Sequence, residues 1–215
     1  LGDDAAHDAQ IVGAKAATLS RLAGRYRVPA GFCLDASVFD RLGAALDGDS
    51  TAVSALRALV AQAHAELGAR TGRGDPVIAV RSSAIGEDGT ETSFAGQHET
   101  VLDVRGVDAI VDAVLACWRS ASSDRAVAYR RTHGITDAPR VGVLVQEQVP
   151  ADSAAIAFSV DPVSGDRETL VIDATFGLGE AIASGSVTPD TYSVRKRDLA
   201  IVKRTIAGER AALDD

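Results

Sequence analysis

The spacing of apolar residues changes beside Asp75 and Pro76, and this change restricts the possible folds of the chain more than any other feature. Before it, apolar residues recur mainly at helical spacing. After it, most segments are short runs of β-branched and apolar residues that alternate with polar ones. Helices therefore dominate the first half and an antiparallel or mixed sheet the second, which predicts an α+β fold.

The expected elements divide the chain into a helical part over about 1–75 and a loop-and-sheet part over about 76–215. Expected helices cover residues 11–24, 36–46, 50–70 and 107–134. Expected strands cover residues 77–83, 98–104, 141–149, 154–163, 168–177 and 190–198. Ser50 or Thr51 is expected to cap the third helix, because a hydroxyl there can accept a free backbone N–H.

The composition restricts the partners and the setting. A net charge of −8 with 22 Lys and Arg leaves no basic face for a nucleic acid backbone, so nucleic acid is not an expected partner. No run approaches the roughly 18 apolar residues of a membrane span, and the first residues lack a secretory signal, which predicts a cytoplasmic protein.

Leu1 as first residue, with no methionine in the chain, predicts a piece of a longer protein. Cys33 and Cys117 have no partner at metal-ligand spacing and are expected to be buried or half-buried thiols.

A long loop of small, hydroxylic and acidic residues follows the expected strand that carries Arg81. Its glycines would let backbone N–H groups approach an anion, and its hydroxyls, beginning with Ser82 and Ser83, would add donors. Arg81 could bind a phosphate through two hydrogen bonds. The residues alone also allow a solvated connection in which Arg81 pairs with Glu87 or Asp88.

Two further segments carry weaker signals. Lys15 follows a glycine at an expected helix start, where free N–H groups attract phosphate, although a lone lysine is also typical of an exposed helix charge. Gln146 and Gln148, followed by Val149, could offer donors and acceptors to a purine edge. The strand alone is equally typical of an ordinary sheet edge.

These segments together resemble a known family. "VGAKAATLSRL", "VRSSAIGEDGTETSFAGQHET", "VLVQEQV" and "IDATFGLGEAIASGSVTPDTYSV" occur in the order and at roughly the spacing of the N-terminal ATP-binding domain shared by pyruvate phosphate dikinase, phosphoenolpyruvate synthase and rifampin phosphotransferase. The resemblance extends over about residues 11–203. It implies an ATP-grasp-like α+β fold in which the nucleotide lies in a cleft between subdomains.

The resemblance implies a role for each matching residue. Lys15 and Arg81 would be the catalytic, phosphate-binding cations, and the loop that carries Gly96 and ends near Thr100 would close over the triphosphate. The implied nucleotide-binding residues are Lys15, Arg81, Ser82, Ser83, Gly96, Thr100, Gln146, Gln148, Val149 and Glu180.

Other implied roles concern adenine and orientation. Gln146 would lie on the hinge strand, and Gln148 and Val149 would be the main-chain partners of adenine. Glu180 would orient Arg81 or another phosphate-binding group, whereas the residues alone also allow Glu180 to belong to a turn and helix cap.

The resemblance also implies a reaction. ATP would be cleaved to AMP and phosphate, and a histidine in another domain or a partner subunit would pass a phosphoryl group to a small acceptor, either pyruvate or a rifamycin-like antibiotic. The family's magnesium ligands and its Gln-x-Arg-Pro segment are not found before Asp215. Mg²⁺ would therefore be held beyond this chain, and the chain alone would not turn over. The alternatives are a nucleotide-binding or regulatory module without its chemistry, and a plain α+β scaffold.

Overall fold

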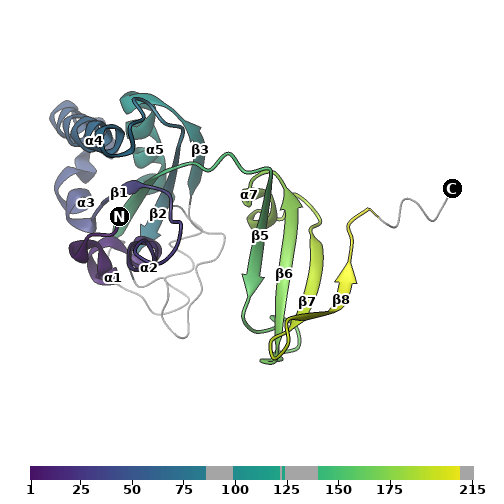
Figure 1. Ribbon diagram of the computed structural model, residues 1–215. Coiled ribbons are helices and arrows are strands. Elements are labelled where there is room, and N and C mark those ends of the chain that lie inside the picture. The colour runs from purple at the N-terminus through teal and green to yellow at the C-terminus, as the bar shows by residue number, and fades with distance from the viewer. Residues whose placement is uncertain (86–98, 122, 124–139, 209–215) are drawn as a thin grey trace. The chain divides into compact units, whose positions relative to one another are not determined.

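The computed structural model describes residues 1–85, 99–121, 123 and 140–208. The chain forms two compact units, Leu1–Gln148 and Val149–Asp215, whose helices and strands are labelled in Figure 1. Each unit has its own four-stranded antiparallel sheet, and most of the helices lie in the first half of the chain. These features confirm the predicted α+β class.

The first unit contains most of the elements. They are η1 (Asp4–His7), α1 (Ala9–Val12), α2 (Ala14–Leu22), β1 (Gly31–Leu34), α3 (Ala36–Leu42), η2 (Gly43–Asp47), α4 (Ser50–Thr71), β2 (Ile78–Ala84), β3 (Thr100–Val104), α5 (Gly106–Ala121) and β4 (Val141–Glu147). The sheet order is β1-β4-β2-β3, and every neighbouring pair is antiparallel. Because β1 pairs with β4, residues from the expected helical part and the expected sheet part pack into one unit.

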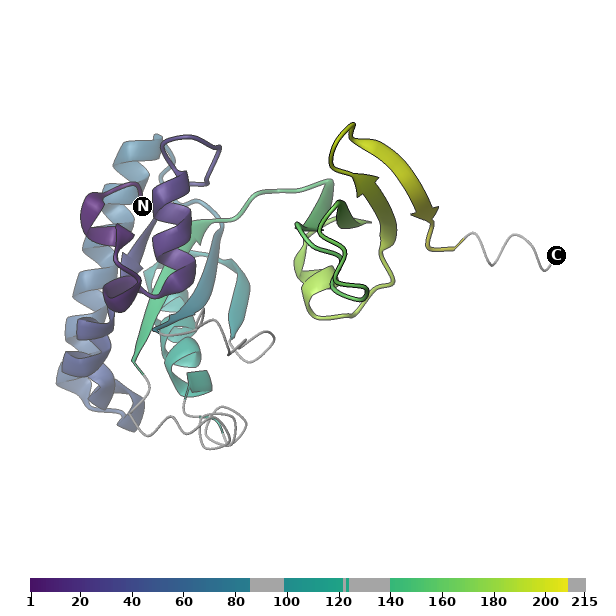
Figure 2. The same ribbon diagram turned by 90° about the horizontal axis from the view of Figure 1, so that it is seen from below.

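The two faces of this sheet meet different helices (Figures 1 and 2). Successive side chains of a strand point to opposite faces. Val80 of β2 and Val143 of β4 belong to the large core formed with α3, α4 and α5. Leu144 of β4 belongs to a smaller core with Val12 of α1 and Ala16 of α2. The central strands are therefore covered on both faces, and one face carries α1 and α2.

The long helix α4 shows how local chemistry sets the ends of an element. The carboxylate of Asp49 accepts the backbone N–H of Ala52 at 2.8 Å, which satisfies a donor that the helix leaves unpaired. Gly72 ends the helix with a φ of 69°, in the left-handed region that favours glycine. The predicted cap at Ser50 or Thr51 is wrong, because both residues lie inside the helix and Asp49 supplies the cap.

The second unit is a simple antiparallel meander. Its elements are β5 (Ser153–Phe158), β6 (Thr169–Phe176), α7 (Glu180–Ala183), β7 (Asp190–Arg195) and β8 (Ala200–Thr205). The sheet order is β5-β6-β7-β8. Among its described residues, Val171 and Val194 are the buried apolar side chains, so its core is small. Within the ranges that the structure describes, no helix is long and apolar enough to cross a bilayer.

Candidate functional site

A pocket of about 290 Å³ lies where the start of α2 meets the sheet of the first unit. Its described lining consists of Ala14, Lys15, Thr18, Leu19, Arg81 and Leu144. The structure thus brings Lys15 and Arg81, which lie far apart in the sequence, to one cavity. The Lys15 Nζ atom lies 3.5 Å from the carbonyl oxygen of Ser82, the residue that follows Arg81.

Local geometry explains this arrangement. Lys15, Thr18 and Leu19 are spaced by three and four residues, so they lie along one face of α2. Arg81 of β2 is the cross-strand partner of Leu144 of β4, and directly paired residues share a sheet face. Because Leu144 packs against α2, the Arg81 side chain lies on the same face as that helix.

The described lining of the pocket is positively charged although the chain is acidic. The described lining includes two cations and no carboxylate, whereas the whole chain has a formal charge of −8. Lys15 is exposed and Arg81 is half-buried, so both can meet a ligand from solvent. A guanidinium and an ammonium at one cavity favour an anion, and a phosphate can accept hydrogen bonds from both.

The two serines that follow Arg81 were predicted to offer hydroxyls to phosphate. Ser82 is 1% exposed, and its Oγ donates to the carbonyl oxygen of Glu99 at 3.3 Å. Ser83 is 0% exposed, and its Oγ accepts the backbone N–H of Ala16 at 3.1 Å. Each hydroxyl therefore has a partner inside the first unit. Gly96, predicted in the following loop, lies outside the described residues.

Two further predicted residues lie on the sheet of the first unit. Thr100 begins β3 and is the cross-strand partner of Arg81, so it lies directly beside the pocket cation. Gln146 of β4 is 5% exposed, and its Nε2 donates to the carbonyl oxygen of Pro29 at 2.9 Å. Neither Thr100 nor Gln146 lines the 290 Å³ pocket.

The predicted adenine partners lie at the end of the first unit. The Gln148 side chain accepts from the Asp103 N–H and donates to the Asp103 carboxylate, both at 2.8 Å. The Gln148 backbone N–H donates to the carbonyl oxygen of Val77 at 2.8 Å. Val149 begins the second unit and is 53% exposed. Gln148 is therefore bonded within its own unit through both its side chain and its backbone N–H.

Glu180 lies in the second unit, as the exposed first residue of α7. Gly179 occupies the cap position of this short helix, and no side chain caps it. Because Glu180 and Arg81 belong to different units, the proposed orientation of Arg81 by Glu180 remains a prediction.

In the turn after β5, the carboxylate of Asp161 accepts hydrogen bonds from its own turn. Asp161 accepts the Ser164 hydroxyl at 2.7 Å and the backbone N–H of Val163 at 2.8 Å. These bonds, the hydroxyl first, lower the pKa of the Asp161 carboxyl below its usual value. The carboxylate is thereby occupied by its own turn.

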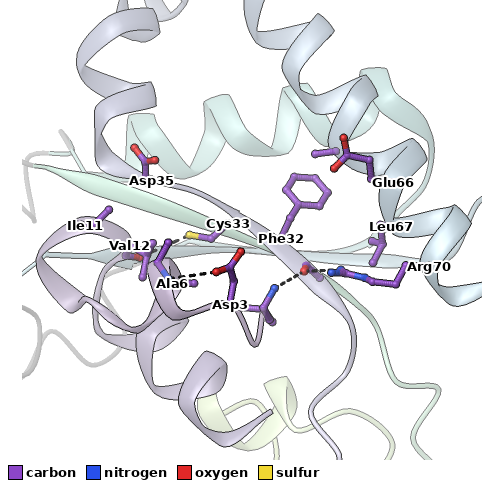
Figure 3. Close-up of a pocket in the computed structure, with 14 residues that line it drawn as sticks. Asp3, Ala6, Ile11, Val12, Phe32, Cys33, Asp35, Glu66, Leu67 and Arg70 are labelled. Carbon is purple, nitrogen blue, oxygen red and sulfur yellow. Dashed lines mark hydrogen bonds between the residues drawn. The ribbon is translucent and has the colours of Figure 1, made fainter. Parts of the chain in front are cut away.

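A second and larger cavity, of about 490 Å³, lies between the N-terminal segment, β1 and α4 (Figure 3). It contains none of the predicted site residues. Two of its charged side chains bond within the fold: Asp35 caps α3 by accepting from Ser37 at 2.8 Å, and Arg70 donates to the carbonyl oxygen of Gly31 at 3.1 Å. The amino group of Leu1 donates to the same carbonyl oxygen at 2.8 Å.

Metal binding has no visible centre in the described part of the chain. No group of three or more His, Cys, Asp or Glu side chains gathers there in a way that could hold a metal ion.

Sequence reasoning missed part of the pocket lining. Thr18 and Leu19 follow Lys15 at helical spacing, and this signal could have placed them beside it. Leu144 could not be found in this way, because its place beside Arg81 depends on the pairing of β4 with β2.

Comparison with known proteins agrees with this picture. Residues 48–213 match the family described as pyruvate phosphate dikinase, AMP/ATP-binding domain. The chain is 41% identical over 228 residues to a rifampicin phosphotransferase of a Streptomyces species, which covers 94% of this chain and 26% of that protein. It is 42% identical over 149 residues to a phosphoenolpyruvate synthase of Pyrococcus furiosus, which covers 69% of this chain and 18% of that protein.

The fold and the pocket define an α+β domain with a cationic cavity suited to phosphate. The chain belongs to the pyruvate phosphate dikinase AMP/ATP-binding domain family, a nucleotide-binding class with an ATP-grasp-like fold. The predicted family and fold class are therefore confirmed. The chain spans about a quarter of the length of the rifampicin phosphotransferases it matches.

Proposed function

We propose that this chain is the ATP-binding part of a dikinase-type phosphotransferase, in which Lys15 and Arg81 bind the phosphates of ATP. The observation that carries the proposal is that these two cations, from α2 and β2, line one pocket without a carboxylate in its described lining. Such groups stabilise charge on a transferring phosphoryl group without forming a covalent bond to it. Membership of an AMP/ATP-binding family supports this assignment.

The reaction we propose cleaves ATP to AMP and phosphate. A phosphoryl group passes to a histidine in another domain and from there to a small acceptor, either a rifamycin-like antibiotic or pyruvate. The similarity to rifampicin phosphotransferases and to phosphoenolpyruvate synthases supports these two acceptors. Mg²⁺, held by groups beyond this chain, would neutralise the developing charge.

The remaining predicted residues complete the proposed site. Thr100 lies beside Arg81 and, with Gly96, contributes to the phosphate end. Gln146, Gln148 and Val149 contribute to the adenine end through their position at the end of β4, where the first unit joins the second.

Calorimetric titration of the chain with ATP and magnesium tests the proposal. Lys15→Ala and Arg81→Ala should each weaken ATP binding by about 10-fold to 100-fold, because a hydrogen bond to a charged group contributes roughly 1.5–3 kcal/mol. Arg41→Ala is the matched control, since Arg41 is an exposed cation that bonds to Ser37 of its own helix, and it should bind ATP like the wild type. Unchanged affinity in both pocket variants would contradict the assignment.

The alternative is a nucleotide-binding or regulatory module that carries out no phosphoryl transfer. Its supporting observation is that the matched family is described as an AMP/ATP-binding domain, which names nucleotide binding and not transfer. AMP formation by the natural protein, followed with rifampicin or pyruvate as acceptor, separates the two. ATP binding with no AMP formed under either condition favours the module.

A further inference from the structure

We infer that Gly13 and Ser83 are positioning residues that set the separation of Lys15 from Arg81. The inference rests on the proposed phosphate-binding role of these two cations and deepens it. Neither Gly13 nor Ser83 lines the pocket. Their contact joins the start of α2 to β2 immediately beside it.

Gly13 connects α1 to α2 in a conformation that only glycine adopts readily. Its φ of 81° and ψ of 161° lie in a region closed to residues with a side chain. The backbone is also in direct contact with the sheet. A Cβ atom added at Gly13 would lie 2.1 Å from the carbonyl oxygen of Ser83 and 2.4 Å from its Oγ. Any side chain at this position must therefore move α2 away from β2.

Ser83 holds the same junction from the other side. Its Oγ accepts the backbone N–H of Ala16 at 3.1 Å, and both residues are 0% exposed. The N–H of Ala16 belongs to the first turn of α2, which has no intrahelical acceptor for such groups. Loss of the hydroxyl would leave a buried N–H unpaired. The bond therefore holds the first turn of α2 at a fixed distance from β2.

A second close contact, between α1 and β4, fixes the position of the junction along the sheet. Gly142 of β4 is the cross-strand partner of Ser83. A Cβ atom added at Gly142 would lie 2.6 Å from the carbonyl oxygen of Val12, the residue before Gly13. The junction between α1 and α2 is therefore in direct contact with both members of the Ser83–Gly142 pair. A Cβ atom would clash there, either on Gly13 or on Gly142.

This contact is linked to the two cations by short, rigid segments. Lys15 lies two residues after Gly13, at the start of α2, and Arg81 lies two residues before Ser83, on β2. Side chains two residues apart on a strand share a face, so Arg81 and Ser83 both face α2. Movement of the Gly13–Ser83 contact would thus move Lys15 relative to Arg81, and a phosphate could no longer meet both cations at once.

The first test compares two glycines with the same φ. Gly13→Ala forces a contact with Ser83, whereas Gly48 has a φ of 81° and nothing within 4 Å of the added Cβ. Both substitutions carry the cost of a positive φ, which is larger at Gly13, with a ψ of 161°, than at Gly48, with a ψ of 18° in the left-handed helical region. Only the first substitution also displaces α2. Calorimetry with Mg-ATP should show ATP binding about tenfold or more weaker in Gly13→Ala than in Gly48→Ala. Equal affinities would overturn the inference.

The second test asks whether the effect acts through Lys15. In a Lys15→Ala background, Gly13→Ala should cause little further loss of ATP affinity, because the cation it misplaces is already gone. The rise in melting temperature at millimolar ATP extends the measurement to weak binding. An equal loss of affinity in both backgrounds indicates general damage to the domain and overturns the inference.

A third measurement does not depend on a substitution at Gly13. Ser83→Ala should speed hydrogen exchange at the Ala16 amide and weaken ATP binding, whether or not Gly13→Ala folds. If Ser83→Ala leaves both quantities unchanged, Ser83 does not position α2. If the wild-type chain does not bind ATP, the proposed function itself fails. If the wild-type chain binds ATP and the Gly13→Ala and Ser83→Ala variants bind it equally well, only the positioning role fails.

Discussion

In the first unit Cys117 is buried and Cys33 is half-buried. Burial raises the pKa of both thiols to about 12. The nearby charge of Asp35 adds to the effect at Cys33, and that of Glu99 adds to it at Cys117. We predict that neither thiol reacts appreciably with an aromatic disulfide reagent at pH 8 in the native protein, because the thiolate is the reactive form. Both should react at once in guanidinium chloride.

The same shift gives a pH dependence. A thiol in the unfolded chain ionises near its ordinary pKa of 9.0, whereas these thiols stay protonated in the native state to about pH 12. The unfolded state therefore binds fewer protons above pH 9, and the free energy of unfolding should fall as the pH rises from 9 towards 12. For the labelling experiment, the Cys33→Ala variant leaves Cys117 as the single thiol. Rapid labelling of native Cys33→Ala would contradict the prediction that Cys117 is unreactive.

At the residue scale, sequence identified the two cations but not the partners of the hydroxyls. Resemblance to a family predicts that Lys15 and Arg81 bind one phosphate, and the structure brings both side chains to one pocket. The acceptor role of Ser83 could not be predicted, because the donor is the N–H of Ala16, which reaches it only through tertiary packing. A sequence shows which side chains can bond, whereas the fold decides which do.

At the scale of elements, α4 offers a direct test of a helix cap. Asp49→Ala removes the acceptor for the Ala52 N–H and should lower the free energy of unfolding by about 1 kcal/mol. Asp49→Asn should retain most of it, because an amide oxygen can also accept that bond. Urea denaturation followed by circular dichroism measures the difference.

The control for the cap is Asp47, an exposed carboxylate two residues earlier, in η2. Asp47→Ala removes the same charge near the start of α4 but not the hydrogen bond to Ala52. It should change the free energy of unfolding by much less than Asp49→Ala. Equal effects from the two substitutions would show that charge, and not capping, stabilises this end.

Most strands and helices followed from periodicity, and the exceptions have physical causes. β1 is not among the expected strands, because its four residues become a strand through pairing with β4, as in Gly31 with Gln146. β8 was missed because exposed polar residues such as Lys203 and Arg204 give it no clear alternation. Its extended form comes from pairing with β7. Tertiary pairing thus decided what local propensity left open.

For the whole molecule, the boundary between the compact units falls after Gln148. The expected helical part, about 1–75, and sheet part, about 76–215, divide the chain by secondary structure and not by compact unit. The change in periodicity near Pro76 marks a change of secondary structure within one unit. Pairing of β1 with β4 and packing of α4 against α5 tie the two sides of Pro76 together. Periodicity reports local structure, so it could not show which elements share a core.

The two hydrophobic cores lie entirely in the first unit, together with the pocket of Lys15 and Arg81. We therefore predict that a fragment of residues 1–148 folds alone and unfolds cooperatively, whereas residues 149–215 do not. The free energy of folding comes mainly from buried apolar surface, and the buried apolar side chains in the described part of the second unit are Val171 and Val194.

Trp118 makes this prediction easy to measure, because it is the only tryptophan of the chain. It is 0% exposed and packs edge-on against Phe39, with the ring centroids 5.4 Å apart. Its fluorescence reports the first unit in both the fragment and the full chain. The urea midpoint of the fragment should match that of the full chain, since no described residue after Gln148 belongs to either core. A broad transition, or a midpoint displaced far below that of the full chain, would mean that the first unit needs residues after Gln148 to fold.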